Sequence, residues 1–160
     1  MIRPGQTRIP RWVPLFNFFA RRLLAIGVPL GPDVLMTVRG RRTGQPRTTP
    51  VTLCEFGGRR GVISPFGEVQ WVKNLRVAGR ATIGIGRRRE EVVAVELDQA
   101  AGAEFIRDVI APIARESRVG GWFVRAVDRI DVDHPADAAV GRPVFEFSPA
   151  PPASPASEGR

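Results

Sequence analysis

Apolar and polar residues alternate along the middle of the chain, which is the pattern of β-strands that bury one face. In the first such segment, Val34, Met36 and Val38 fall on one side of the predicted strand. The turns between segments are short, so neighbouring strands are expected to pair antiparallel, in hairpins and a meander. The pattern therefore predicts a mainly β (α+β) protein with strands at residues 33–39, 48–56, 60–64, 81–86, 88–97 and 143–147.

Ahead of the strands, apolar residues such as Phe19 and Leu23 recur at helical spacing. Arg21 and Arg22 interrupt this apolar run, which leaves it too short to span a bilayer and unlike a signal peptide. Residues 1–29 are therefore predicted to form an amphipathic helix. Two roles stay open for it: packing over one end of the strands, or peripheral contact with a membrane surface.

Helical spacing returns in three later segments. A helix is predicted from about Glu68 to Ala78, with N-terminal amides that are free to bind an anion. Asp98 is expected to cap a second helix, which Pro112 should kink or end. A short third helix is expected to end near Ile130.

Length and composition predict a single core domain. At 160 residues and 43% hydrophobic, the chain has room for one core, which is expected over residues 30–147. Residues 148–160 are rich in Pro, Ala and Ser and are expected to be disordered. The single cysteine and single histidine exclude an internal disulfide and a cluster of Cys or His ligands, so no metal site is expected.

The charge balance favours an anionic partner. The chain has 24 basic and 16 acidic residues, a formal net charge of +8, and Lys73 is its only lysine. A phosphate-bearing cofactor, a nucleic acid and a membrane surface are all compatible with such a balance. A nucleic-acid partner is not expected, because most of the aromatic residues follow amphipathic spacing and belong in a core.

The predicted turn after residue 38 concentrates this charge. It contains two glycines and four arginines: Gly40, Gly44, Arg39, Arg41, Arg42 and Arg47. Guanidinium groups form charge-assisted, often bidentate bonds with phosphate or carboxylate, and glycines let the backbone approach a ligand closely. The turn is therefore a candidate anion site, with a solvated basic turn as the alternative.

Two motifs here resemble a known family. The run from Gly40 to Pro50 looks like the G-R-[KR]-[ST]-G-x-P-R-x-x-P signature of the deazaflavin-dependent nitroreductase family, and the run from Ser64 to Arg76 is similar to its second block. The resemblance covers about Leu30 to Phe147. It implies an FMN-binding-like split β-barrel that binds coenzyme F420, with the basic loop on the phosphate and acidic tail of the coenzyme. The cofactor-binding residues that it implies are Arg41, Arg42, Thr43, Gly44, Gln45, Arg47, Thr48, Thr49, Pro50, Ser64, Pro65, Phe66, Gly67, Trp71, Lys73, Asn74 and Arg76.

The resemblance also implies a function. It indicates an F420-dependent oxidoreductase that transfers a hydride between the reduced coenzyme and a small organic acceptor, such as a quinone, an enone or a nitro compound. The best understood nitroreductases of that family use tyrosines to contact the substrate and donate a proton, and this chain has no tyrosine, so its catalytic residues stay unassigned. The alternatives are an FMN-binding split-barrel protein and a non-catalytic cofactor-binding protein. A cytoplasmic location, with or without peripheral membrane contact, and a homodimer are further expectations.

Overall fold

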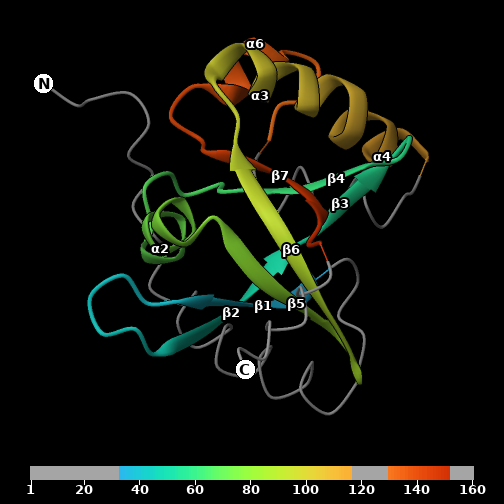
Figure 1. The fold of residues 1–160 in the computed structure, drawn as a ribbon. Coiled ribbons are helices and arrows are strands. Elements are labelled where there is room, and N and C mark those ends of the chain that lie inside the picture. Colours follow the sequence, from blue (N-terminus) through green and yellow to red (C-terminus); the bar gives the residue numbers. More distant parts are fainter. Residues whose placement is uncertain (1–32, 117–129, 152–160) are drawn as a thin grey trace, which may run out of the picture.

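Within the described residues, seven strands form one sheet in which every neighbouring pair is antiparallel (Figure 1). The computed structural model describes residues 33–116 and 130–151. The order of strands in the sheet is β2-β1-β5-β6-β7-β4-β3. This confirms the predicted mainly β, antiparallel architecture. The strands are β1 (Asp33–Arg39), β2 (Pro46–Thr52), β3 (Cys54–Phe56), β4 (Arg59–Ile63), β5 (Arg80–Ile85), β6 (Arg88–Glu96) and β7 (Val144–Pro149).

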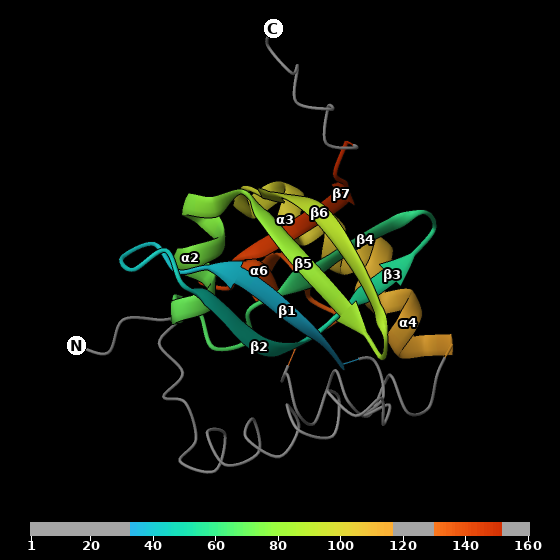
Figure 2. The same cartoon turned by 60° about the horizontal axis from the view of Figure 1, so that its bottom comes forward.

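One continuous segment supplies both edges of the sheet. β2 pairs with β1, with Pro50 opposite Leu35, whereas β3 pairs with β4 at the other edge. Leu53 separates the two strands. Because the same segment runs along both edges, the sheet curls into the split β-barrel that the resemblance implies (Figure 2). The prediction of one strand over residues 48–56 is wrong here, since alternation of side chains does not reveal a change of partner.

The inner face of the barrel forms one hydrophobic core. Met36, on the side of β1 that alternation predicts to be buried, is fully buried there. The helix α2 (Gln70–Ala78) adds Val72 and Leu75, both fully buried, to the same core. This helix begins two residues after the predicted start at Glu68. The barrel and α2 therefore share one apolar interior.

A second core lies between the sheet and a helical layer. The layer consists of α3 (Gln99–Phe105), the π-helical turn η1 (Ile106–Ile110), α4 (Ala111–Glu116) and α6 (Pro135–Ala139), which Figure 1 shows together over β4 and β7. Cys54 of β3 is buried in this core. The sheet is thus covered on its two faces by different elements.

The helical layer begins as predicted and continues further than predicted. The Asp98 carboxylate accepts a hydrogen bond from the Ala101 amide at 2.8 Å and so caps α3. Pro112 does not end the helical segment. The chain stays helical from Gln99 to Glu116, with the π-helical turn directly ahead of α4 and Pro112 as the second residue of α4.

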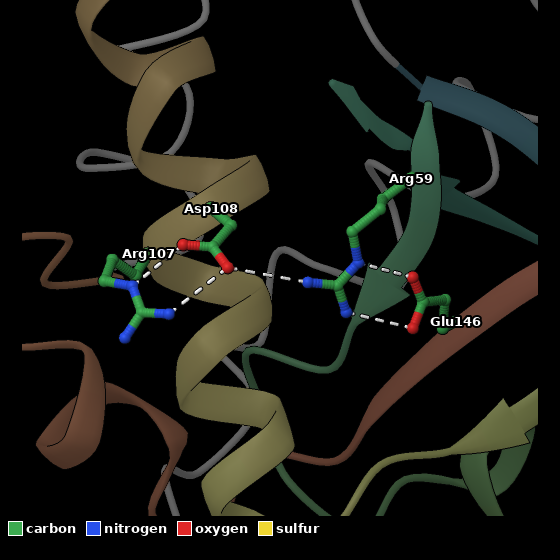
Figure 3. Close-up of polar contacts among 4 residues, drawn as sticks. All are labelled: Arg59, Arg107, Asp108 and Glu146. Atoms are coloured by element: carbon green, nitrogen blue, oxygen red, sulfur yellow. Dashed lines mark hydrogen bonds and ion pairs between the residues drawn. The ribbon is translucent and has the colours of Figure 1, made fainter. Parts of the chain in front are cut away.

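Arg59 joins the helical layer to the sheet (Figure 3). Its guanidinium donates to both carboxylate oxygens of Glu146 on β7, at 2.7 and 3.0 Å, and lies 3.7 Å from the carboxylate of Asp108 on η1. It also lies over the Phe105 ring, 5.4 Å from the ring centroid. Arg107 pairs with the same Asp108 at 2.8 Å. These contacts connect β4, β7 and η1.

Some predicted elements lie outside the described residues: the amphipathic helix of residues 1–29 and the helix expected to end near Ile130. The C-terminal tail is described only as far as Pro151. Before that point, β7 runs to Pro149, two residues beyond its predicted end, and pairs there with β6. In the described ranges, none of the helices has the length and apolar character that crossing a bilayer requires.

Candidate functional site

The hairpin between β1 and β2 lies beside α2 (Figures 1 and 2). The two elements border a cavity of about 510 Å³. The cavity is lined by Val38, Gly40, Arg41, Arg42, Thr43, Arg47, Thr49, Gln70, Trp71 and Asn74. The structure thus brings together residues of both sequence motifs. Those that the resemblance assigns to the cofactor and that line this cavity are Arg41, Arg42, Thr43, Arg47, Thr49, Trp71 and Asn74.

The backbone of the hairpin is closed by its own hydrogen bonds. The Gly40 amide donates to the Gln45 carbonyl and the Gly44 amide to the Gly40 carbonyl, both at 2.8 Å. The Gln45 amide donates to the Thr43 hydroxyl at 3.3 Å. Gly44 has φ of 69°, which favours glycine, whereas a Cβ on Gly40 would lie 3.1 Å from the Gln45 carbonyl. The amides of Gly40, Gly44 and Gln45 are therefore bonded within the loop.

Arg41 is held in place by two amide side chains of α2. Its Nη1 donates to Asn74 Oδ1 at 2.8 Å, and Nη1 and Nη2 both donate to Gln70 Oε1 at 3.1 Å. The Arg41 backbone amide also donates to Asn74 Oδ1, at 3.3 Å. Asn74 is 8% exposed, so its position is set by the packing of α2 against the barrel. These bonds fix the guanidinium of Arg41 at the edge of the cavity.

The cavity carries positive charge that nearby acids do not neutralise. Among the described residues, Arg41, Arg42 and Arg47 form no ion pair with a carboxylate. Arg42 and Arg47 are exposed. No group of His, Cys, Asp and Glu residues in the described ranges could hold a metal ion. The arrangement therefore suits an anion more than a cation.

Trp71 and Val38 form the apolar part of the cavity wall. The Trp71 ring is half-buried and packs against Phe145, with the ring centroids 6.1 Å apart and the planes at 55°. Trp71 thus belongs to the edge of the barrel core and to the cavity at once. A planar ligand with an anionic tail would meet an aromatic surface and arginines in one place.

The first part of the second motif forms a turn that leads into α2. Ser64 is fully buried, and its hydroxyl donates to the Gly67 carbonyl at 2.7 Å. The Ser64 amide donates to the Pro143 carbonyl at 2.9 Å, and Gly67 has φ of 74°. The polar groups of Ser64 are thus used to hold the entry to α2. This segment contributes to the cavity indirectly, by placing the helix.

Arg76 lies in a different environment from the cavity arginines. Its guanidinium donates to Glu96 at 2.5 and 2.6 Å and to Glu68 at 2.7 and 2.9 Å. The hydrogen bonds to Glu96 raise the pKa of Arg76 most, and those to Glu68 raise it further. The hydrogen bonds from Arg76 in turn lower the pKa of Glu68. The structure does not bring Arg76 to the cavity, and its charge is matched by two carboxylates.

Some predicted site residues do not line the cavity, and some residues that line the cavity were not predicted. Predicted residues that do not line it are Gly44, Gln45, Thr48, Pro50, Ser64, Pro65, Phe66, Gly67, Lys73 and Arg76. Their assignment to the cofactor stays a prediction. Conversely, Val38 and Gln70 line the cavity without having been assigned to it, and Gly40 lines it as part of the candidate anion turn. Gln70 was detectable from the sequence, because it lies four residues before Asn74 and hence one turn away on the same helical face.

The curled sheet and the basic cavity define a split-barrel protein, and comparison with known proteins gives its family. The sequence model of a family described as F420H(2)-dependent quinone reductase matches residues 19–119, more than half of the chain. The chain belongs to this family. The resemblance to a deazaflavin-dependent family that the two motifs carry is thereby confirmed. No curated protein matches the chain.

Solved structures with detectable similarity include a chain titled as an F420-H2 dependent reductase, with 22% sequence identity and a TM-score of 0.44, over 73% of this chain and 94% of that chain. Another is a putative pyridoxamine 5'-phosphate oxidase from Listeria innocua, with 14% identity and a TM-score of 0.48, over 83% and 94% respectively. A third is titled as a domain-swapped dimer, with 21% identity and a TM-score of 0.47, over 86% and 97%. With TM-scores below 0.5, these matches decide nothing about the site or the assembly.

Proposed function

We propose that this chain is an F420H2-dependent reductase whose cavity between the β1–β2 hairpin and α2 binds the coenzyme, and that it passes a hydride to a small organic acceptor. The observation that carries the proposal is the cluster of Arg41, Arg42 and Arg47 beside Trp71, without a carboxylate partner in the described ranges. Membership of an F420H2-dependent quinone reductase family supports the same cofactor. A quinone, an enone or a nitro compound is the proposed acceptor.

The residues of the cavity fit the chemistry of an anionic, planar cofactor. A volume of about 510 Å³ lies within the usual range of ligand pockets. Arg41, Arg42 and Arg47 would hold a phosphate and carboxylate tail through charge-assisted bonds. Trp71 and Val38 offer an apolar surface for a ring system and exclude water from one side of it.

The reduced deazaflavin supplies the hydride when it is bound, so the protein has little covalent chemistry to perform. The cavity residues bind and orient the coenzyme, and the apolar wall limits access of water. The chain has no tyrosine, and its only histidine, His134, is exposed beside α6 and bonded to Asp131 at 2.9 Å. Proton delivery to the acceptor is therefore proposed to come from solvent.

Titration of the purified chain with F420 and with FMN, followed by fluorescence, tests the proposal. We expect saturable binding of F420 and much weaker binding of FMN, whose tail carries a single phosphate. With F420H2, we expect oxidation of the coenzyme to depend on an added quinone such as menadione. Saturable FMN binding in the absence of F420 binding would reject the proposed cofactor in favour of an FMN-binding protein.

A further inference from the structure

The acceptors that hold Arg41 are unusual for a fixed arginine, because they carry no charge. Four hydrogen bonds restrain this residue, three from the guanidinium and one from the backbone amide, and all end on the amide oxygens of Gln70 and Asn74. These two residues are one turn apart on α2, which packs on the barrel core. Arg41 is therefore restrained by a rigid element while its positive charge is left uncompensated.

Arg76, on the same helix, shows the opposite arrangement. Its guanidinium is held by two carboxylates, those of Glu68 and Glu96, which place two negative charges beside one positive charge. A carboxylate restrains an arginine as well as an amide does, but it also competes with any anionic ligand for the guanidinium. An amide oxygen accepts the same hydrogen bonds and leaves the charge available.

We infer that Gln70 and Asn74 are positioning residues that orient Arg41 for an anionic group of the ligand without neutralising it. This inference rests on the proposed function for the identity of the ligand, a phosphate or carboxylate of the coenzyme tail. Because the guanidinium is oriented before the ligand arrives, less side-chain freedom is lost on binding. Gln70 and Asn74 thus raise affinity through Arg41 and not through contacts of their own.

An isosteric charge change separates this role from simple packing. In Gln70→Glu, the side chain keeps its shape and its bond to Arg41, and only a negative charge is added at the cavity. We expect F420 affinity to fall about tenfold, because the new ion pair competes with the ligand, while the melting temperature is unchanged or rises. Asn74→Asp makes the same change one turn away and is expected to act in the same direction. Gln99→Glu, an exposed position outside the cavity, is the matched control and should leave affinity within twofold.

A double-mutant cycle tests whether the effect passes through Arg41. In an Arg41→Ala background, Gln70→Glu is expected to have a clearly smaller effect, because the residue that it positions is gone and only the direct repulsion between the new carboxylate and the ligand remains. An equal loss of affinity in both backgrounds would overturn the inference, as would equal affinities of Gln70→Glu and Gln99→Glu. Either result, together with normal F420 binding by the unaltered chain, would leave the proposed function standing.

A second probe keeps the two proposals distinguishable. The same cycle is measured with inorganic pyrophosphate by calorimetry, which reports on the anion site whether or not F420 is the ligand. Pyrophosphate binding that depends on Gln70 through Arg41, without binding of F420, would support the positioning role and reject the proposed function. Absence of binding to both probes would overturn both.

Discussion

Two regions of this molecule use arginine in opposite ways. At the junction of β4, β7 and η1, Arg59 is bonded to both carboxylate oxygens of Glu146 and lies near Asp108 (Figure 3). At the cavity between the β1–β2 hairpin and α2, Arg41 is bonded only to amide oxygens, and Arg47 has no carboxylate partner among the described residues. The junction is held together by neutralised charge, whereas the cavity keeps charge that a ligand can use.

The comparison shows that the number of arginines says little about where an anion binds. With 24 basic residues in the chain, many positions could be candidates. The partner distinguishes them: a carboxylate within hydrogen-bond distance marks a structural arginine, and an amide or no partner marks one that is available. Four substitutions probe the junction and the cavity, from the largest expected effect to the smallest.

Gly61→Ala should destabilise the junction region more than any other change proposed here. A Cβ at Gly61 would lie 2.2 Å from the Phe145 carbonyl and 3.0 Å from the Phe105 ring, so β4 and β7 could not keep their spacing. We expect a loss of about 3 kcal/mol or more in the free energy of unfolding. Gly84→Ala is the control, since the nearest atom there is 3.6 Å away, and urea unfolding of both variants checks the difference. Equal urea midpoints for Gly61→Ala and Gly84→Ala would mean that β4 and β7 can move apart at little cost in stability.

Arg47→Ala should impair the cavity without affecting the fold. Arg47 is exposed and lines the cavity, so its removal leaves no buried group unpaired. We expect the loss of one charge-assisted bond to the ligand, about 1.5–3 kcal/mol, which lowers F420 affinity roughly tenfold to a hundredfold. Arg87→Ala, in the exposed β5–β6 turn away from the cavity, removes the same charge and should leave affinity nearly unchanged (Figure 2). If Arg47→Ala and Arg87→Ala had equal F420 affinities and equal melting temperatures, the hairpin would be only a basic turn and not a binding site.

Glu146→Gln should weaken the junction in a pH-dependent way. The hydrogen bond from Arg59 lowers the pKa of Glu146 below its ordinary value of 4.5. A lowered pKa in the folded state stabilises the protein above the unfolded pKa, and this stability is lost as the pH falls through the folded pKa. Because Arg59 and Glu146 are about one-third exposed, we expect a difference of about 1–2 kcal/mol at pH 7.

Urea unfolding from pH 7 down to pH 3 measures this difference. The stabilities of the unaltered chain and of Glu146→Gln should converge as the pH falls below about 4.5. If the difference in unfolding free energy between the two proteins did not change with pH, the effect of Glu146→Gln would come from packing and not from charge. F420 affinity at pH 7 should be the same in both proteins, because Glu146 lies outside the cavity.

Arg76→Ala should have the smallest effect, and it decides a point on which the sequence and the structure differ. The resemblance assigns Arg76 to the cofactor, whereas the structure pairs it with Glu68 and Glu96. Since its side chain is 41% exposed, we expect a stability loss of about 0.5–1 kcal/mol, with F420 affinity within twofold of the unaltered chain. A tenfold loss of affinity would instead place Arg76 in the binding site.

Much of the fold was predictable because it depends on local patterns. The period of two placed Met36 on the buried side of β1, and the position of Asp98 before an apolar helical pattern predicted the cap of α3. The exchange of partners at Leu53 was not predictable, because both halves of that segment alternate in the same way. Pro112 was expected to kink or end the helix, but the helical segment continues through it to Glu116, with a π-helical turn directly ahead of α4.

The sequence by itself determined the composition of the site: a glycine-bounded turn rich in arginine, followed by a helix that carries Trp71 and Asn74. Only the tertiary structure decided which arginines are available. Glu146, the partner of Arg59, is 87 residues away from it in the sequence. Glu96 is 20 residues away from its partner Arg76, and Asn74 is 33 residues away from Arg41. The charge of an arginine is a property of the residue, but its compensation depends on which groups the fold brings within about 3 Å of it.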